Sequence, residues 1–356
     1  MQRAPSKILV VRNDRLGDFM LAYPTFLLLK QALPRTEVHA LVPAYTKEMA
    51  DCCPGIDATV IDPGPKAGAA EQRALLGRLR QERYDAILAL YSTTRVGVLA
   101  FLAGIPYRLA PATKLAQVFY NRRLVQRRSR SEKPEYQYNL DLAFKLLADF
   151  GVLAGPVPLR PYLRFPDNDI SSLRSAFCRS RNIPETDMLV FIHPGSGGSA
   201  GNLSVEQFAA LARRLRSPKP FTVVITAGPG EEGKAARLQK LLGGVPNTIY
   251  HSKDGLRRFA QHIQFADVFV SGSTGPLHIA GALDRPTAAF YTRRRSATSL
   301  RWQTLNSEGR RLAFSPPETA APEDMSAVDI EAAADEISRS YLFGTDRQPS
   351  AEDTGT

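Results

Sequence analysis

The segment Val268–Pro286 reads V-F-V-S-G-S-T-G-P-L-H-I-A-G-A-L-D-R-P and predicts a strand, a tight polar turn and a helix in succession. Its first residues, Val268–Ser271, are apolar or small and are typical of the end of a buried strand. Pro276 fits the first turn of a helix, where its missing N–H costs nothing. The apolar residues of 277–283 recur on one side of that helix. The segment therefore indicates one strand–turn–helix unit.

The turn of this unit, Ser273-Thr274-Gly275, is a candidate anion site. The first N–H groups of a helix have no partner within the helix, and the helix dipole favours negative charge beside them. His278 lies about one turn further on, where it can face the same anion. We interpret the turn as a diphosphate site. From this segment alone, an ordinary capped strand-to-helix turn is the alternative.

Length, charge and cysteine content narrow the class of protein. The chain has 356 residues, enough for two domains with sizeable cores. Its formal net charge of +11 indicates an anionic partner: a nucleotide, a nucleic acid or an anionic lipid surface. Cys52, Cys53 and Cys178 have neither metal-binding nor disulfide spacing, so we expect a reducing compartment.

Neither a secretory segment nor a membrane span is expected. The N-terminus leads directly into a strand, without the hydrophobic region of a signal peptide. The longest apolar stretch, about residues 96–106, is too short to span a bilayer. We therefore expect a cytoplasmic protein that can touch the inner face of a membrane.

Strands and helices alternate in the first part of the chain. Strands are predicted at Lys7–Val11, Glu37–Val42, Val60–Ile61 and Tyr84–Leu90, and helices at Phe19–Ala32, Ala69–Glu82 and Tyr138–Phe150. This alternation predicts a doubly wound α/β domain over residues 1–166, which binds ligands where its strands end. The proline-rich end of this domain, 151–166, predicts an extended linker.

The residues that follow the linker, Asp167-Asn168-Asp169, look like the D-x-D metal motif of some sugar transferases. A cap of a helix over 170–181 explains them better, because Asp and Asn are favoured at that position. A second α/β domain is then predicted over 186–326, beginning with the strand Met188–Ile192. Further on, Asp329–Tyr341 predicts a last helix, and residues 342–356 are expected to be disordered.

The loop 193–202 of the second domain holds four glycines in ten residues. Glycine lets backbone N–H groups approach a phosphate closely, so Gly195, Ser196 and Gly197 are candidate ligands. The loop matches neither a P-loop nor the glycine spacing of a dinucleotide fold. Glu231 follows the next predicted strand, Phe221–Thr226. Its spacing suits a ribose hydroxyl or a charge in the first turn of a helix equally well.

The stretch 108–130 contains seven Lys or Arg residues and no acid, interleaved with aromatic residues such as Phe119 and Tyr120. Such a run suits nucleic acid or a phosphorylated lipid, but a solvated loop is its commonest fate. For residues 108–130, two interpretations therefore stay open: a surface that faces the acceptor or a membrane, and a solvated loop.

Three stretches together, Lys7–Pro24, Phe191–Phe208 and Ser271–Pro286, resemble the lipopolysaccharide heptosyltransferases, the ADP-heptose-dependent glycosyltransferase family 9. The specific element is (Ser/Asp)-Thr-Gly-Pro-x-His-x-Ala, at 273–280, and the early Gly17-Asp18 accompanies it. The resemblance implies a GT-B architecture, with two doubly wound Rossmann-like domains facing a cleft. The N-terminal domain would bind the acceptor and the C-terminal domain the ADP-sugar, and the helix 329–341 would pack back on the first domain.

The resemblance also implies an inverting, metal-independent transfer of heptose from ADP-heptose to a lipopolysaccharide core acceptor. Asp18 matches the general base of the family; a helix cap is the alternative. The expected donor-binding residues are Gly195, Ser196, Gly197, Glu231, Ser273, Thr274, Gly275, Pro276 and His278. The expected acceptor-binding residues are Arg12, Arg15 and Gly17. We expect no cofactor, no metal and no nucleic acid, and a monomer in peripheral contact with the inner membrane.

One departure from the family pattern concerns Gly201, where many members carry a lysine that neutralises the diphosphate. Another cation, such as one of Arg293–Arg295, would substitute, or leaving-group stabilisation would be weaker, or the donor would differ. Ser273 in place of aspartate is a milder variation. Two other functions stay open: transfer of a different sugar or to a different acceptor, and nucleotide binding without transfer. No nucleic-acid module occurs, and the glycine spacing excludes a nicotinamide oxidoreductase.

Overall fold

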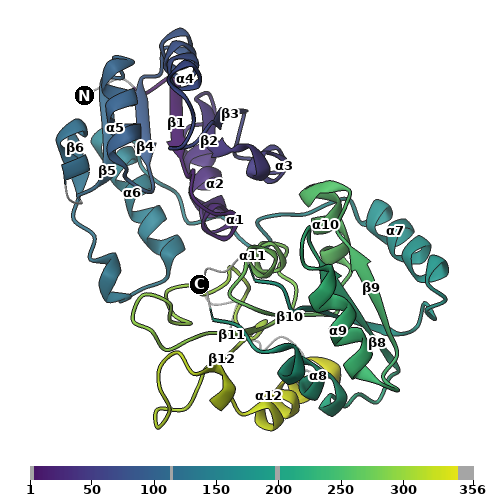
Figure 1. Ribbon diagram of the computed structural model, residues 1–356. Helices are drawn as coiled ribbons and strands as arrows, with labels where there is room; N and C mark the ends of the chain where they lie inside the picture. The colour runs from purple at the N-terminus through teal and green to yellow at the C-terminus, as the bar shows by residue number, and fades with distance from the viewer. Residues whose placement is uncertain (1–3, 113–114, 197–200, 344–356) are drawn as a thin grey trace, which may run out of the picture.

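The computed structural model describes residues 4–112, 115–196 and 201–343, and Figure 1 shows them as two α/β lobes. The first lobe contains a six-stranded parallel sheet in the order β3-β2-β1-β4-β5-β6. Its strands are β1 (Lys7–Val11), β2 (Glu37–Pro43), β3 (Ala58–Asp62), β4 (Ala86–Ala89), β5 (Tyr107–Pro111) and β6 (Arg122–Leu124). Successive side chains of a strand point to opposite faces. Accordingly, Ile8 and Val10 enter one core of the lobe, and Leu9 and Val11 enter another.

Helices cover both faces of this sheet, as the sequence predicts for a doubly wound domain. They are α1 (Leu16–Met20), α2 (Tyr23–Ala32), α3 (Lys47–Asp51), α4 (Ala69–Glu82), α5 (Thr94–Leu102) and α6 (Glu135–Asp149). The predicted helix over 69–82 is confirmed. The single helix predicted at Phe19–Ala32 is instead two, because Pro24 takes the second position of a new helix after a turn at Leu21 and Ala22. Asp18 consequently lies in the first turn of α1 rather than before a helix.

The second lobe repeats the architecture with the parallel order β12-β11-β10-β7-β8-β9. Its strands are β7 (Met188–His193), β8 (Phe221–Ala227), β9 (Asn247–His251), β10 (Val268–Gly272), β11 (Thr287–Phe290) and β12 (Arg311–Phe314). Its helices are α7 (Asp167–Ser180), α8 (Val205–Arg214), α9 (Glu232–Leu242), α10 (Gly255–Gln264), α11 (Gly275–Ala282) and α12 (Ile330–Ile337). The central strand β10 is buried throughout, as its sequence predicts. The expected fold, two doubly wound α/β domains, is confirmed.

The last helix is an exception to the expected domain organisation. α12 packs against α8, and its buried Ala333, Ala334 and Ile337 belong to the core of the second lobe. The backbone N–H of Arg216 donates to Ser338 Oγ at 3.0 Å and fixes the end of this helix to the same lobe. The expectation that it packs back on the first domain is therefore wrong. The apolar face of α12 is covered by α8 of the same lobe. Of the tail that was expected to be disordered, residues 344–356 lie outside the described part of the chain.

The expectation of a helix cap at Asp167–Asp169 is also wrong. α7 begins at Asp167 with Pro166 in the cap position, and no side chain caps it. The Asp167 carboxylate instead pairs with Arg164, three residues earlier. In the described residues, no group of three or more histidine, cysteine or acidic side chains is placed to hold a metal ion.

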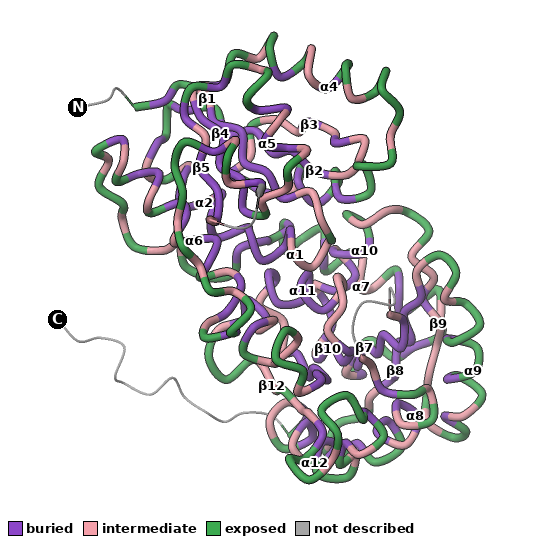
Figure 2. The backbone as a smooth tube through the Cα atoms, turned by 60° about the vertical axis from the view of Figure 1, so that its left-hand side comes forward, coloured by how far each residue is buried: buried purple, intermediate pink, exposed green. Residues whose placement is uncertain are grey.

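A single apolar core joins the two lobes at α1 and α11. Phe19 and Met20 of α1 belong to the same buried cluster as Leu277 and Ile279 of α11. Figure 2 shows buried backbone continuing from one helix to the other. The site between the lobes is therefore built on two helices that touch each other directly. Within residues 4–343, as far as they are described, every helix is too short or too polar to cross a membrane.

Candidate functional site

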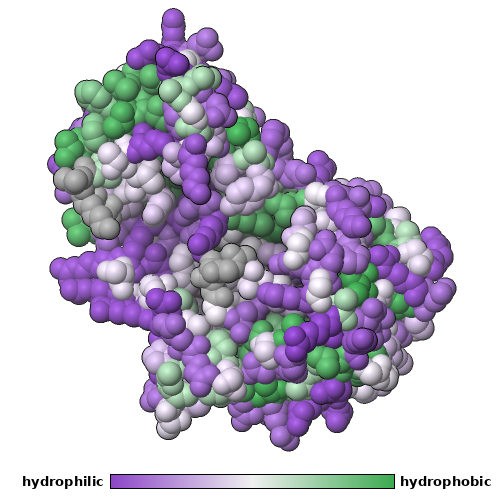
Figure 3. Space-filling view, viewed as in Figure 1, coloured by the Kyte–Doolittle hydropathy of each residue, from purple (hydrophilic) through white to green (hydrophobic). Residues whose placement is uncertain are grey.

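A cleft of about 1060 Å³ lies between the two lobes, where strands of both sheets end. Its walls come from α1 on one side and from the residues after β8, β9, β10 and β11 on the other. Figure 3 shows the hollow between the lobes. Ligands of doubly wound sheets bind outside the carboxyl ends of the strands, and this cleft occupies that place in both sheets.

The first lobe contributes Arg15, Gly17 and Asp18 to the cleft wall. Arg15 takes the cap position of α1, and the Asp18 side chain is 14% exposed. Asp18 Oδ1 accepts a hydrogen bond of 2.5 Å from Arg12 Nη2. No hydrogen bond joins its Oδ2 to another described residue, so Arg12 holds one carboxylate oxygen and leaves the other without such a bond. The prediction that Asp18 faces the cleft agrees with this geometry.

Arg12 was expected to contact the acceptor, and the structure does not support that role. Its side chain is 2% exposed and lies behind Asp18 rather than in the cleft wall. Its nitrogens are held by the carboxylates of Asp14, Asp18 and Glu135. Burial alone would lower the pKa of this guanidinium, but the three carboxylates outweigh burial and raise the pKa above the ordinary value of arginine. Burial raises the pKa of the Asp14 carboxyl to about 6, against the attraction of Arg12. Arg12 is thus a fixed cation that holds the carboxylates of the loop after β1.

The turn between β10 and α11 provides the opposite wall, with Ser273, Thr274, Gly275 and Pro276. Thr274 is the cap residue of α11, but its hydroxyl lies 3.0 Å from Ser271 Oγ and makes no cap hydrogen bond. The first N–H groups of α11 are therefore not occupied by a capping side chain. They border the cleft, as expected for an anion site.

Gly275 has a structural role that its sequence context does not reveal. A Cβ at this position would lie 2.8 Å from Leu16 Cδ2 in the first lobe. A Cβ at Gly17 would likewise lie 2.8 Å from His278 Cδ2 in the second lobe. The two glycines therefore allow α1 and α11 to approach each other. A side chain at Gly275 would therefore disturb the contact between α1 and α11.

His278 borders the cleft from the first turns of α11 and is only 3% exposed. Desolvation lowers the pKa of its imidazole to about 4, so the ring is neutral at pH 7. Its Nδ1 is buried and has no hydrogen-bond partner among the described residues. His278 consequently supplies a neutral polar group, not a positive charge, to this end of the cleft.

The buried His278 predicts a loss of stability in acid. Because its folded pKa lies below the ordinary value of about 6.5, the unfolded chain binds the proton more readily between pH 6.5 and 4. The contribution of the neutral His278 to the free energy of unfolding is complete above about pH 6.5. It decreases by up to ~3 kcal/mol as the pH falls to 4. Urea unfolding at pH 7 and pH 5 should show a smaller acid loss for His278→Gln than for the wild type. Equal losses in wild type and His278→Gln would contradict the assignment.

Glu231 joins the site from the cap position of α9. Gly228 N–H donates to Glu231 Oε2 at 2.8 Å, and His193 Nε2 lies 3.7 Å from the same oxygen. A Cβ on Gly195 would overlap the Glu231 carboxylate at 2.1 Å, so this glycine makes room for it. The carboxylate lines the cleft, and desolvation lowers the pKa of the His193 imidazole behind it. The sequence left two roles open for Glu231, a ribose ligand and a charge at a helix N-terminus. The structure is compatible with both, because Glu231 lies at the N-terminus of α9 and in the cleft wall.

The glycine-rich loop contributes less than expected in the described residues. Gly195 and Ser196 are not in the cleft wall, and Gly197 lies outside the described part of the chain. Gly201 does line the cleft, but a Cβ there would lie 2.5 Å from Thr292 Cγ2. A lysine cannot occupy this position unless Thr292 moves.

Several cleft residues have no counterpart in the sequence prediction. They are Tyr45, Ser252, Lys253, Leu256, Phe259 and Trp302. Ser252 and Lys253 could have been predicted from their place directly after β9, because the residues that follow parallel strands lie at the same edge of the sheet. Trp302 lies in a long connection between β11 and β12, for which local patterns give no position.

Comparison with known proteins agrees with this geometry. Residues 72–309 match the family described as glycosyltransferase family 9 (heptosyltransferase). A Haemophilus influenzae protein named only as a glycosyltransferase is 41% identical over 335 residues, which are 93% of this chain and 96% of that protein. Lipopolysaccharide heptosyltransferase 2 of Salmonella typhimurium is 24% identical over 294 residues, covering 80% of this chain and 82% of the relative.

Solved heptosyltransferases share the fold of this chain at low sequence identity. The structure of Escherichia coli ADP-heptose lipopolysaccharide heptosyltransferase II aligns with a TM-score of 0.75 at 18% identity, covering 94% of this chain and 98% of the other. An Escherichia coli heptosyltransferase solved with ADP gives 0.71 at 17% identity, with 94% and 99% coverage. The expected GT-B architecture is confirmed. On the match over 72–309 and the 41% identical relative, the chain belongs to glycosyltransferase family 9, the heptosyltransferase family.

Proposed function

We propose that this glycosyltransferase is an inverting, metal-independent enzyme that transfers a heptose from ADP-heptose to a lipopolysaccharide core acceptor. The observation that carries the proposal is the shared cleft, in which Asp18 of the first lobe faces the N-terminus of α11 in the second. A carboxylate on one side and helix N–H groups on the other suit removal of a proton and binding of a diphosphate. The named heptosyltransferase relatives support the choice of sugar.

Asp18 is proposed as the general base. Its free Oδ2 would take the proton of the acceptor hydroxyl while that oxygen attacks the anomeric carbon. The bond from the anomeric carbon to the diphosphate breaks at the same time, and ADP leaves with the electron pair. Attack on the face opposite the leaving group inverts the anomeric centre. Because Arg12 already holds Oδ1, the carboxylate does not have to reorient during the reaction.

The leaving diphosphate would be bound by the N-terminus of α11 together with two cations. Arg15 and Lys253 both line the cleft, one from each lobe, and their side chains form no ion pair or hydrogen bond within the described residues. By contrast, Arg294 pairs with Glu323, and Arg293 donates to the backbone carbonyls of Glu318 and Ala320. We therefore propose Arg15 and Lys253, rather than Arg293 or Arg294, as the charges that replace the family lysine at Gly201.

The ribose of the donor is assigned to Glu231. Its carboxylate lines the cleft at the end of β8 and is fixed by Gly228 N–H. A carboxylate at this position of a doubly wound sheet can accept hydrogen bonds from ribose hydroxyls. No cofactor is required by this scheme, because hydrogen bonds and the positive charges of Arg15 and Lys253 would stabilise the diphosphate.

The deciding experiment is to incubate the purified protein with ADP-heptose and truncated core lipids and to measure the acceptor mass. A gain of one heptosyl unit is expected. A gain only with another nucleotide-sugar or another acceptor would support the alternative of a different transfer. Binding of ADP without any mass gain across donors and acceptors would support a nucleotide-binding protein without transfer.

We further propose that the enzyme works at the cytoplasmic face of the inner membrane, through a surface of α5, β5 and β6. This surface includes exposed Phe101 and Leu102, with the Arg108 guanidinium 5.5 Å from the Phe101 ring centroid. Arg122 and Arg123 are exposed on β6, the edge strand of the sheet. Figure 3 shows hydrophobic residues gathered over α5. Apolar side chains beside arginines fit an anionic lipid surface.

The lipid surface is tested with vesicles that contain anionic phospholipid. Each basic residue near such a surface contributes about 1 kcal/mol, so reversing two charges, Arg122→Glu with Arg123→Glu, should weaken binding at least about tenfold. The control, Arg214→Glu with Lys240→Glu on the second lobe, makes the same charge change and should bind like the wild type. Equal weakening in both pairs would show a dependence on net charge alone and would contradict this surface.

A further inference from the structure

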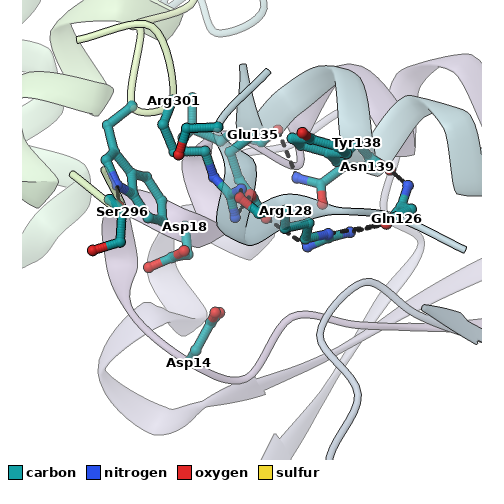
Figure 4. Close-up of polar contacts among 12 residues, drawn as sticks. Asp14, Asp18, Gln126, Arg128, Glu135, Tyr138, Asn139, Ser296 and Arg301 are labelled. Atoms are coloured by element: carbon teal, nitrogen blue, oxygen red, sulfur yellow. Dashed lines mark hydrogen bonds and ion pairs between the residues drawn. The ribbon is translucent and has the colours of Figure 1, made fainter. Parts of the chain in front are cut away.

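Six charged side chains, three arginines and three carboxylates, form a connected cluster that begins at the cleft wall. Glu135, the first residue of α6, is 1% exposed and lies at its centre. Figure 4 shows the cluster and its neighbours, with Arg128 and Arg301 close to Glu135 and with Asp18 beside the same group. Three arginines, Arg12, Arg128 and Arg301, pair with this one carboxylate. Desolvation opposes its ionisation, but these guanidinium groups hold the Glu135 pKa below the ordinary value.

The cluster connects the two lobes. Arg12 and Glu135 belong to the first lobe, whereas Arg301 belongs to the connection between β11 and β12 in the second. Arg301 is held at three points: its guanidinium pairs with Glu135 Oε2, the same group donates to the backbone carbonyl of Arg128, and its own carbonyl accepts from Glu135 N–H at 2.9 Å. Nearby, Ser131 Oγ donates to the Arg295 carbonyl. The connection is thus fastened to the first lobe by side-chain and main-chain contacts.

The contacts continue without a break to Asp18. Glu135 Oε1 accepts from Arg12 Nη1 at 2.9 Å, and Arg12 Nη2 donates to Asp18 Oδ1 at 2.5 Å. A guanidinium is a rigid planar fork, so a shift at one nitrogen moves the others. The position of the Asp18 carboxylate is therefore mechanically tied, through two residues, to Arg301.

The connection that carries Arg301 also borders the cleft. Thr292, Ser296, Ala297 and Trp302 all line it. A molecule bound in the second lobe would touch the same segment that holds Glu135. The connection between β11 and β12 therefore contacts both the second-lobe side of the cleft and, through Glu135 and Arg12, the Asp18 carboxylate of the first lobe.

We propose that Arg301 is a positioning residue for Asp18, acting through Glu135 and Arg12, so that the second lobe holds the base of the first lobe in place. The inference rests on the proposed role of Asp18. Stability alone does not explain the cluster, because a buried ion pair is often no more stabilising than apolar residues of the same volume. Orientation of a reacting group does explain it, since a misplacement of about 1 Å can cost about 10²-fold in rate.

The test compares Arg301→Met, which keeps much of the volume, with Arg301→Lys, which keeps the charge without the fork. The control is Arg237→Met on the surface of the second lobe, which breaks an exposed ion pair with Glu206. Arg301→Met should lower kcat at least about tenfold, with ADP affinity and donor KM within about twofold of wild type. Arg301→Lys should recover part of the loss, and Arg237→Met should match the wild type. In the Asp18→Asn background, Arg301→Met should cause no further loss.

A second readout does not depend on activity. Amide hydrogen exchange over residues 12–20 should increase in Arg301→Met and stay unchanged in Arg237→Met, because the loop loses its support. Unchanged exchange there together with unchanged kcat would overturn the positioning role and leave the proposed function intact. An equal further loss from Arg301→Met in the Asp18→Asn background would also overturn it. A wild-type protein without transferase activity would refute the proposed function, while the exchange experiment would still decide whether Arg301 supports the loop.

Discussion

Replacement of Asp18 by asparagine should lower kcat for sugar transfer by about 10²–10⁴-fold, the usual contribution of a general base. The amide has nearly the same shape as the carboxylate, and its oxygen can still accept from Arg12. It cannot take the proton of an acceptor hydroxyl. ADP affinity should remain within about twofold of wild type, because Asp18 is not one of the groups proposed to bind the diphosphate. Steady-state kinetics and calorimetric titration with ADP measure the two quantities separately.

The matched control for this experiment is Asp14→Asn. Asp14 lies in the loop just before α1 and binds the same guanidinium through Arg12 Nε, but it is not part of the cleft wall. Its loss should lower the rate far less than the loss of Asp18. Comparable rates for Asp18→Asn and wild type, or a larger loss from Asp14→Asn, would remove Asp18 from the role of base.

The sheets of both domains were predictable because parallel strands buried on both faces read as short apolar runs. Lys7–Val11 and Val268–Ser271 are such runs, and each is followed by a polar loop and a helix. Asp18 and Thr274 lie in the segments after these strands, and both were predicted to border the cleft from local pattern and family resemblance. Their places in the cleft follow from the parallel arrangement, which brings the ends of all strands to one edge.

Long-range contacts decide the features that the sequence did not reveal. Arg12 looks like a ligand of an anionic substrate when read with its neighbours, but Glu135, 123 positions away, accepts its hydrogen bond and buries it. Gly275 looks like a phosphate contact, although the atom nearest to its missing side chain is Leu16 of the other lobe. The apolar face of α12 is clear in the sequence, but the helix that it contacts is not. The periodic spacing of apolar residues shows that one face of a helix is buried, but it does not show which element covers that face.

Arg12→Met should destabilise the protein by about 3–5 kcal/mol, the range for removing one partner from buried ion pairs. The methionine fills part of the volume but leaves the partly buried Asp14 without a neutralising partner and removes one of the three arginines from Glu135. By comparison, Arg339→Met removes an exposed pair with Glu336 and should cost no more than ~1 kcal/mol. Urea unfolding at pH 8 measures both free energies.

The pH dependence of the Arg12→Met defect identifies its cause. Burial raises the pKa of Asp14 to about 6 even beside Arg12, and loss of the cation should raise it further. A carboxyl with a raised folded pKa stabilises the protein below its unfolded pKa and loses this contribution as the pH rises through the folded value. The deficit of Arg12→Met should therefore be largest at pH 8 and shrink towards pH 5, whereas that of Arg339→Met should stay small throughout. A deficit that is independent of pH would show that the loss of stability comes from lost packing and not from unpaired carboxylate charge.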